Sequence, residues 1–298
     1  MMNNSKKRNK IIKITAIITT VIFAVVLYWV RNPLGIDKLL HNKNFDTSQD
    51  FIEFLDVGQA DCALIYSNGY SALIDVGLPT TANDISSEIS NYGIKTLDAV
   101  IISHHHSDHV GGLPQIAQNF KIDNLIMPPL LEKSTSTAIK GKANAIKSGC
   151  DYFDAIPGMN FNIGEFEITI LSNFSDKTNE NNRSLYVMAE INGIKFLFTG
   201  DAERKMENLL LKENLDIDCD VLKVSHHGSN TSSSKAFLNA TTPEYAVISV
   251  GEDNIYSHPH SETLSSLKKQ SKVYRTDHSG DITFNIDGKN VTVETENR

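Results

Sequence analysis

A run of four histidines and one aspartate is the part of this sequence best suited to chemistry. It reads HHHSDH and occupies residues 104–109. In an extended chain, alternate side chains point the same way, so His104 and His106 should face one side together. Asp108 and His109 follow in the turn and can reach a neighbouring point. This spacing could give one metal ion two imidazoles, and a second ion a carboxylate and an imidazole. A solvated histidine tract is the alternative, and the embedded aspartate argues against it.

Two further candidate ligand positions follow apolar runs. Asp201 comes just after residues 196–199, and His226 and His227 come just after residues 221–224. Taken alone, Asp201 could be the N-cap of the next helix, and the two histidines could be ordinary loop residues. Three strand ends with ligand-type side chains in one chain favour a shared metal site.

The elements that must position these motifs follow from the apolar patterning. Short apolar runs divided by turn residues predict hairpin-rich sheet with interspersed helices, in two halves. This arrangement is typical of two sheets packed face to face with helices outside. Strands are expected at 51–57, 62–66, 72–76, 99–103, 125–127, 167–171, 185–191, 195–199, 221–225, 245–250, 282–286 and 291–294. Helices are expected at 83–92, 112–119, 202–213, 234–239 and 261–269, with loop and weak helix over 132–150.

The first 31 residues differ from the rest. The uncharged apolar segment Ile14–Val30 follows a basic cluster and ends at Tyr28 and Trp29, which predicts one uncleaved transmembrane anchor. The basic flank should stay cytoplasmic, which places the bulk of the chain outside the membrane. If the segment were instead a cleaved signal peptide, the protein would be secreted. Residues 32–50 should be a linker, and residues 51–298 should form the folded domain.

Charge and cysteine content exclude two classes of protein. The formal net charge is −8, but residues 32–298 hold 22 basic and 36 acidic residues, a net charge of −14. Such a domain does not hold nucleic acid through a diffuse basic surface. The three cysteines form no CxxC pair, which excludes a cysteine-based zinc site, and we expect them to be buried.

In combination the motifs resemble a known family. HHHSDH is similar to the HxHxDH motif of metallo-β-lactamase fold hydrolases, and TGD (199–201) and SHHGS (225–229) fit the same superfamily. The closer resemblance is to the hydrolase domain of ComEC-type competence proteins. It rests on DVGQAD (56–61), LIDVG (73–77), NNRSL (181–185) and SHPH (257–260). The likeness covers roughly residues 51–286 and implies an α+β fold, a four-layer αββα sandwich with metals at one edge.

The resemblance also implies a ligand set for two divalent ions. By matched position, the first ion would take His104 and His106, the second would take Asp108, His109 and His227, and Asp201 would bridge them. His227 is preferred to His226 by likeness to phosphorylcholine esterases of this fold. In those enzymes, the counterparts of His226 and Glu203 lie near the substrate phosphate. Glu203 could equally be a solvated acid in the first turn of a helix.

One departure from the family concerns the first ion. The superfamily often supplies a third histidine between HxHxDH and TGD, but no histidine lies between Val110 and Ser225. Asn182 is the best replacement, directly or through water. More oxygen donors leave zinc possible and give manganese a real chance.

Three more residues have candidate roles beside the metals. Asp75 and Asp61 could orient ligand imidazoles, or could simply form turns. His258 could contact the substrate phosphate or leaving group, or could be a structural loop residue.

The predicted function is metal-dependent hydrolysis by a water activated between two ions, with Asp108, His226, Glu203 and His258 closest to the reaction. The substrate should be anionic: a phosphodiester, as in single-stranded DNA or another nucleic acid, or a phosphocholine-type ester. The alternatives are a non-catalytic or accessory surface protein in DNA uptake, and a hydrolase of a lactone or β-lactam. Beyond the membrane, no protein partner is indicated.

Overall fold

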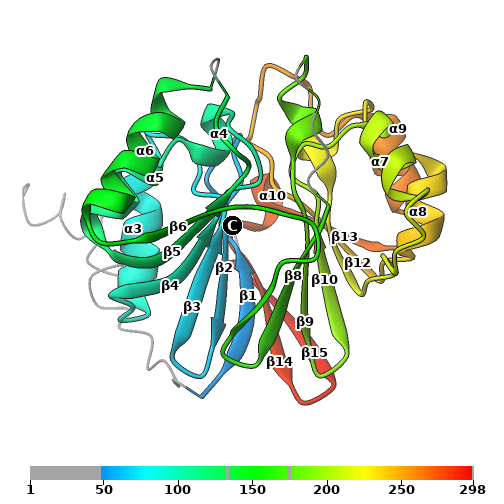
Figure 1. The fold of residues 1–298 in the computed structure, drawn as a ribbon. Helices are drawn as coiled ribbons and strands as arrows, with labels where there is room; N and C mark the ends of the chain where they lie inside the picture. Colours follow the sequence, from blue (N-terminus) through cyan, green and yellow to red (C-terminus); the bar gives the residue numbers. More distant parts are fainter. Residues whose placement is uncertain (1–47, 132–133, 173–175, 177, 297–298) are drawn as a thin grey trace, which may run out of the picture. The chain divides into compact units, whose positions relative to one another are not determined.

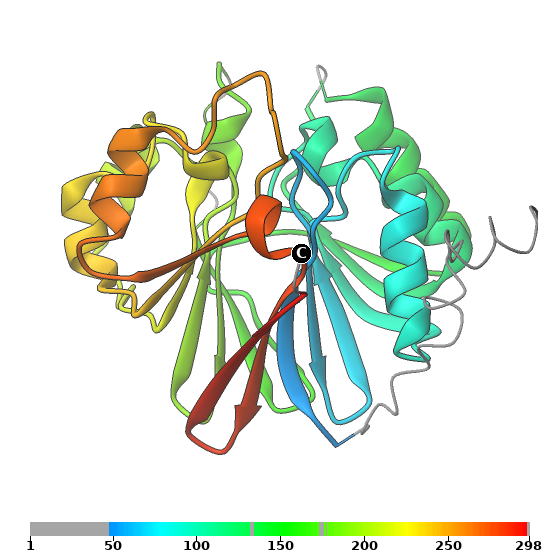
Figure 2. The same cartoon turned by 180° about the vertical axis from the view of Figure 1, so that it is seen from behind.

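Two sheets packed face to face form the centre of the fold (Figures 1 and 2). The computed structural model describes residues 48–131, 134–172, 176 and 178–296. The first sheet has the order β15 (Asn290–Thr295), β14 (Ile282–Asp287), β1 (Asp50–Phe54), β2 (Ala63–Ser67), β3 (Tyr70–Ile74), β4 (Thr96–Ile101), β5 (Lys121–Met127), β6 (Asp151–Asp154). The second has the order β13 (Lys272–Arg275), β12 (Tyr245–Ile248), β11 (Val221–Lys223), β10 (Ile194–Phe198), β9 (Tyr186–Ile191), β8 (Phe166–Ser172), β7 (Asn160–Ile163).

Helices cover the outer face of each sheet, which confirms the predicted αββα sandwich (Figure 1). The first sheet carries α3 (Ala82–Asn91), α5 (Leu113–Asn119) and α6 (Ser136–Lys147). The second carries α7 (Arg204–Leu210), α8 (Lys235–Thr241) and α9 (Ser261–Leu267). Shorter pieces are α4 (Ser107–Val110), α10 (Thr276–Ser279) and the 3-10 turns η1 (Asn181–Arg183) and η2 (Ser225–Gly228).

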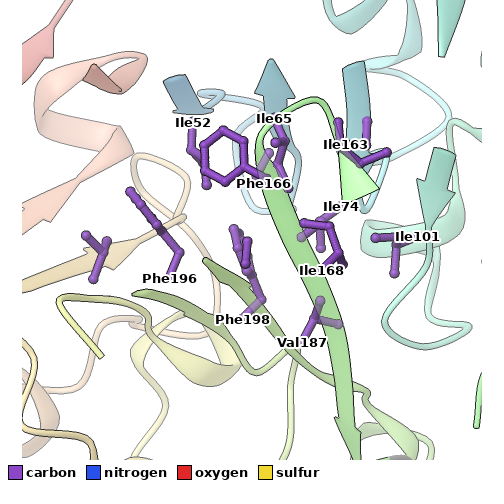
Figure 3. Packing of buried hydrophobic residues seen from close by; sticks show 14 of the residues in the cluster. Ile52, Ile65, Ile74, Ile101, Ile163, Phe166, Ile168, Val187, Phe196 and Phe198 are labelled. Carbon is purple, nitrogen blue, oxygen red and sulfur yellow. The ribbon is translucent and has the colours of Figure 1, made fainter. Parts of the chain in front are cut away.

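The main core lies between the two sheets (Figure 3). Ile52, Ile65 and Ile74 from the first sheet face Phe166, Phe196 and neighbouring side chains from the second. All five residues of β2 are buried, because helices cover one face of the sheet and the second sheet covers the other. A second apolar cluster fills the space between the second sheet and helices α7 to α9. The apolar runs of the sequence are explained by this burial on both faces.

Parallel pairing brings the chemically interesting loops to one edge. β3 pairs in parallel with β4, and β10, β11 and β12 are parallel to one another. Their carboxyl ends therefore point the same way, and the loops after Ile74, Ile101, Phe198 and Lys223 can meet. The backbone N–H of Leu185 donates to the carbonyl of Ser103 over 3.0 Å, which joins the two sheets at this edge.

Some elements differ from the expectation. β6, β7 and β13 were not predicted, because they are short and rich in polar residues. The stretch 132–150 holds the twelve-residue helix α6, which is capped by the Thr135 side chain accepting from Ala138 N. Small residues let it pack closely, since a Cβ on Gly141 would lie 2.7 Å from the Leu113 side chain. The three cysteines are free and buried, as expected.

The predicted membrane anchor at 1–31 lies outside the described residues, as does most of the predicted linker. Within residues 48–296, apart from the three short gaps in the description, none of the helices has the length and apolar character needed to span a bilayer. The anchor and the domain boundaries stay predictions.

Candidate metal centre

The histidine motif turns out of β4 with its imidazoles divided as the extended spacing predicts. His104 Nε2 and His106 Nδ1 lie 3.1 Å apart, so the two rings converge on one point. His105 faces away, where its Nε2 donates to the carbonyl of Pro128 over 3.1 Å. The chain then forms the single turn α4, which carries Asp108 and His109.

Two loops from earlier strands hold that turn in place. The N–H of Asp61 donates to the carbonyl of Asp108 (3.0 Å), and the N–H of Val76 donates to the carbonyl of His109 (2.8 Å). Gly112 is required beside them, because a Cβ there would lie 2.2 Å from the carbonyl oxygen of Val76. The DVGQAD and LIDVG motifs therefore make backbone contacts with the turn that carries the candidate ligands Asp108 and His109.

The second sheet contributes the remaining ligands. Asp201 follows β10, and its N–H donates to Ser184 Oγ over 2.9 Å. One carboxylate oxygen, Oδ1, lies 3.3 Å from His109 Nε2, and the other, Oδ2, lies 3.8 Å from His104 Nε2. The Asp201 carboxylate thus stands between the two halves of the histidine motif, in the position of a bridging ligand.

Two clusters of possible ligand atoms result, and both include Asp201. One comprises His104, His106 and Asp201, and the other comprises Asp108, His109, Asp201 and His227. These are the two ligand sets that the family resemblance implies. His227 Nε2 lies 3.3 Å from Asp108 Oδ2, the same separation as between His109 Nε2 and Asp201 Oδ1. Two ligands each about 2.0–2.1 Å from one tetrahedral ion are themselves about 3.3 Å apart, so both distances fit a shared ion.

Hydrogen bonds fix which ring nitrogen is available to an ion. His109 Nδ1 donates to Asp75 Oδ2 (2.8 Å), and His227 Nδ1 donates to the carbonyl of Ser249 (2.9 Å). Ser103 Oγ donates to Asp75, so it accepts from His104 Nδ1 at 3.1 Å. When these three rings are neutral, the lone pair is therefore on Nε2 in each of them. Orientation of ligand imidazoles through the other nitrogen is typical of metal sites.

Charges around the site shift the histidine pKa values in opposite directions. Burial lowers the pKa of His104 well below its usual value. Burial also opposes the charged form of His109, but the carboxylates of Asp201, Asp75 and Asp108 outweigh it and raise the pKa. The pKa of His227 is raised for the same reason, with burial outweighed by Asp201 and Asp61. Several carboxylates therefore concentrate negative charge around the second cluster and favour a cationic partner there.

A cavity of about 330 Å³ opens over the two clusters. Its described lining residues are Gln59, His106, Ser107, Asp108, Asn181, Asp201, His226, His227, Tyr256 and His258. The lining is polar or aromatic at every one of these positions, and it includes neither lysine nor arginine.

His226 and His258 line this cavity, as their predicted substrate roles require. His226 Nε2 lies 3.8 Å from Asp201 Oδ2, and both it and His227 adopt a positive φ in η2. The rings of His226 and His258 are 5.5 Å apart between centroids. Burial, followed by the nearby His227, His226 and His260, lowers the pKa of His258 to about 4, so its ring is neutral near pH 7.

Two expectations need correction. Asn182 belongs to neither ligand cluster and does not line the cavity: its Oδ1, the atom that would bind a metal, accepts from the N–H of Glu203 over 3.1 Å. The neighbouring Asn181 lines the cavity instead, with its Nδ2 3.4 Å from His226 Nε2. Glu203 does not line the cavity either. Its carboxylate accepts from Asn179 Nδ2 over 3.0 Å, at the start of α7.

The two candidate orienting aspartates divide their roles. Asp75 orients His109, as described above. Asp61 forms a buried ion pair with Lys223, with Nζ and Oδ2 2.6 Å apart, and its other oxygen, Oδ1, lies 3.4 Å from Nδ1 of His227. Sequence reasoning missed Lys223, although a lysine within the apolar run VLKV was a usable signal. It also missed the cavity positions of Gln59 and Tyr256, which carry no ligand-type side chain.

The fold and this edge define a class of protein. Residues 55–252 match the family model of the metallo-β-lactamase superfamily, and the chain belongs to that superfamily. The fold is shared with the metallo-β-lactamase fold protein YhfI from Bacillus subtilis, at a TM-score of 0.53 and 12% identity, over 80% of this chain and 100% of that one.

Among curated proteins, two relatives carry the closer resemblance. The chain is 33% identical to "ComE operon protein 3" of Bacillus subtilis over 196 residues, which is 64% of this chain and 25% of the relative. It is 32% identical to "Competence protein ComA" of Neisseria gonorrhoeae over 238 residues, 78% of this chain and 31% of the relative. The predicted likeness to competence proteins is confirmed, and the chain spans about a quarter to a third of their length.

Proposed function

We propose that this protein is a metal-dependent hydrolase that cleaves a phosphodiester. The observation that carries the proposal is the pairing of His109 Nε2 with Asp201 Oδ1. Both atoms are buried and converge to 3.3 Å, close enough for an ion pair, but neither makes a hydrogen bond of good geometry within the described part of the chain. Orphaned buried polar atoms are costly, so a missing partner that satisfies both is expected. A divalent cation satisfies a histidine lone pair and a carboxylate together.

The donor set fits two such ions. The second cluster offers two imidazoles and two carboxylates, and the first offers two imidazoles and the far oxygen of Asp201. Mixed nitrogen and oxygen donors suit zinc or manganese. When bound, two ions would lower the pKa of the water between them and neutralise negative charge on the phosphoryl group.

The chain's own residues complete the site. Asp108 is partly exposed at the cavity, so it can hold an ion while its free edge faces the reacting group. His226 and His258 stand on the wall beside Asp201, where a ring N–H can donate to a phosphoryl oxygen. Because no described lining residue is lysine or arginine, charge neutralisation depends on the ions. This supports an anionic substrate that reaches the ions directly.

The likeness to two competence proteins suggests a setting for this activity. We infer that the protein serves competence at the membrane, with residues 1–31 as an anchor and the hydrolase domain outside the cell. Single-stranded DNA or a related phosphodiester would then be its substrate. A phosphocholine-type ester, a lactone and a β-lactam are the competing substrates.

The deciding experiment is a metal-supplemented activity panel. The full-length chain, purified in mild detergent and treated with chelator, is reloaded with zinc or manganese. It is then offered bis-p-nitrophenyl phosphate, single-stranded DNA, a phosphocholine ester, a lactone and a β-lactam. Metal-dependent cleavage of the phosphodiesters supports the proposal. Retention of no metal together with cleavage of no substrate would overturn it and leave a non-catalytic accessory role.

A further inference from the structure

The loop between β12 and α9 carries an aromatic side chain into the cavity. We propose that Tyr256 is the platform on which a nucleobase stacks, which makes it the residue that selects single-stranded nucleic acid as the phosphodiester. The inference rests on the proposed function and adds a specificity residue to the same site. Tyr256 lines the cavity although 58% of its surface is exposed, and its neighbour Ile255 is 90% exposed.

A row of near-parallel rings connects this tyrosine with the metal centre. The rings of Tyr256 and His258 are inclined by 24° with centroids 5.7 Å apart. The rings of His258 and His227 are also inclined by 24°, with centroids 6.2 Å apart. His227 belongs to the second ligand cluster. If a bound molecule places its phosphate at the metal clusters, the ring of Tyr256 offers it a flat aromatic surface, separated from His227 by the ring of His258.

The loop presents Tyr256 in one arrangement, because the side chain of Asn254 ties the loop's two ends together. Its Nδ2 donates to the carbonyls of Gly251 (2.9 Å) and His258 (2.8 Å), and its Oδ1 accepts from His258 N–H (3.0 Å). The N–H of Gly251 in turn donates to Oε1 of Gln59, which also lines the cavity. A platform held in this way loses little conformational entropy when a base stacks on it.

The polar and aromatic wall of the cavity favours a nucleobase over an acyl chain. None of the described lining residues is aliphatic, so an acyl chain would meet no apolar wall. A nucleobase has an aromatic face for Tyr256 and polar edges for the amides of Gln59 and Asn181. Stacking on aromatic side chains is how single-stranded nucleic acid is held where base sequence is not read. Affinity from stacking also suits a domain whose net charge repels the phosphate backbone.

Two synthetic strands of equal length separate stacking from phosphate binding. One is an oligothymidylate, and the other has the same phosphodiester backbone with tetrahydrofuran in place of every nucleoside. For the metal-loaded full-length protein, KM should be about 5- to 150-fold lower for the base-bearing strand, as expected for one stacked base. Tyr256→Ala should reduce this preference to about one, and Tyr256→Phe should keep it. Asn254→Ala should weaken it, because the loop is no longer tied.

A matched control is Tyr70→Ala, since Tyr70 is 52% exposed at the far end of the first sheet. It should leave the preference as in the wild type. The inference is overturned if the wild type does not distinguish the strands, or if Tyr256→Ala keeps the preference. Fluorescence anisotropy of the labelled strands measures the same ratio without turnover. Failure of the proposed hydrolysis is thereby distinguished from failure of the platform.

Discussion

The carboxylate of Asp75 accepts a hydrogen bond from Nδ1 of His109 over 2.8 Å. The same carboxylate accepts from the backbone N–H and the hydroxyl of Ser103, each over 2.7 Å. Ser103, the residue just before the histidine motif, therefore holds the Asp75 carboxylate in place. It sets the ring orientation of His109 and leaves Nε2 for an ion.

Replacing Asp75 by asparagine should weaken metal binding. An amide can satisfy His109 Nδ1 but carries no charge to raise the basicity of the ring. Loss of such a partner typically costs 10- to 100-fold in metal affinity. Titration of the metal-free protein with zinc measures the change. Asp98→Asn is the control, because Asp98 accepts from Ser71 N–H in the same sheet and contacts no ligand. Equal affinities for wild type and Asp75→Asn would show that His109 needs no such partner.

Removing the bridging carboxylate should abolish turnover. Asp201→Ala deletes an oxygen from both ligand clusters, and Asp108→Ala deletes one from the second. We expect a loss of at least about a thousandfold in kcat/KM for bis-p-nitrophenyl phosphate, as for removal of an essential catalytic group. Bound metal per chain should fall as well. Circular dichroism and the unfolding temperature of the metal-free proteins report whether the fold is kept, and substantial activity in Asp201→Ala would contradict the two-ion arrangement.

Metal affinity should depend on pH more steeply at the second cluster than at the first. The raised pKa values of His109 and His227 mean that their protonated forms persist above the ordinary histidine range of about 6.5. An ion must displace those protons, so affinity should rise with pH until both raised pKa values are passed. Each displaced proton contributes up to about tenfold per pH unit.

At the first cluster, His104 has a lowered pKa. Its ring is therefore already neutral near pH 7 and releases no proton when an ion binds. Calorimetric titration at several pH values, in buffers of different ionisation enthalpy, counts the protons released by each ion. Release of no proton near pH 7 would contradict the prediction.

The buried pair of Lys223 and Asp61 should show strong energetic coupling. Both side chains are almost fully buried, and Lys223→Met would leave the Asp61 carboxylate without its cation. Breaking such a pair from one side costs about 3–5 kcal/mol. Combining it with Asp61→Asn should restore much of that loss, because no lone charge then remains buried. Denaturant unfolding of the metal-free single and double variants measures the coupling, and additive effects would contradict it.

Asp281 should make the protein less stable as pH rises. Burial raises the pKa of its carboxyl to about 6, against an ordinary value of 3.8. Between these values the unfolded chain has lost the proton and the folded chain keeps it. The contribution of this carboxyl to stability therefore falls between about pH 4 and pH 6 and is constant above that range. Asp281→Asn removes this cost, which is at most about 3 kcal/mol, and can still accept from Asp56 N–H. The variant and wild type should be equally stable below pH 4 and differ at pH 7.

Much of the fold could be predicted because the buried strands are recognisable in the sequence. β2 and β4 are apolar runs ended by turn residues, and the ligand motifs directly follow β4, β10 and β11. The edge strands could not be found in this way. β6 has exposed or half-buried residues throughout, so its sequence carries no core-facing pattern, and its place depends on pairing with β5.

Within the site, the histidines and aspartates expected as metal ligands lie together, as predicted. Asn182 and Glu203, which were chosen for their position in the sequence, lie outside the cavity. Nothing in the sequence distinguishes Asn181 from Asn182, because the choice depends on the turn η1, which directs one side chain to the cavity and the other to Glu203. Tyr256 could not be singled out, because its position depends on the loop that Asn254 ties. Pairwise contacts of this kind arise only in the folded chain.

The absence of lysine and arginine from the described cavity wall has a consequence for behaviour in salt. Proteins that grip a phosphate backbone with basic side chains displace condensed counterions, so their affinity falls steeply as salt is added. Here few counterions would be displaced, and added salt would also screen the repulsion from a domain of net charge −14 over residues 32–298. Such an enzyme would keep its affinity for substrate at salt concentrations that release most nucleic-acid-binding proteins from their ligands.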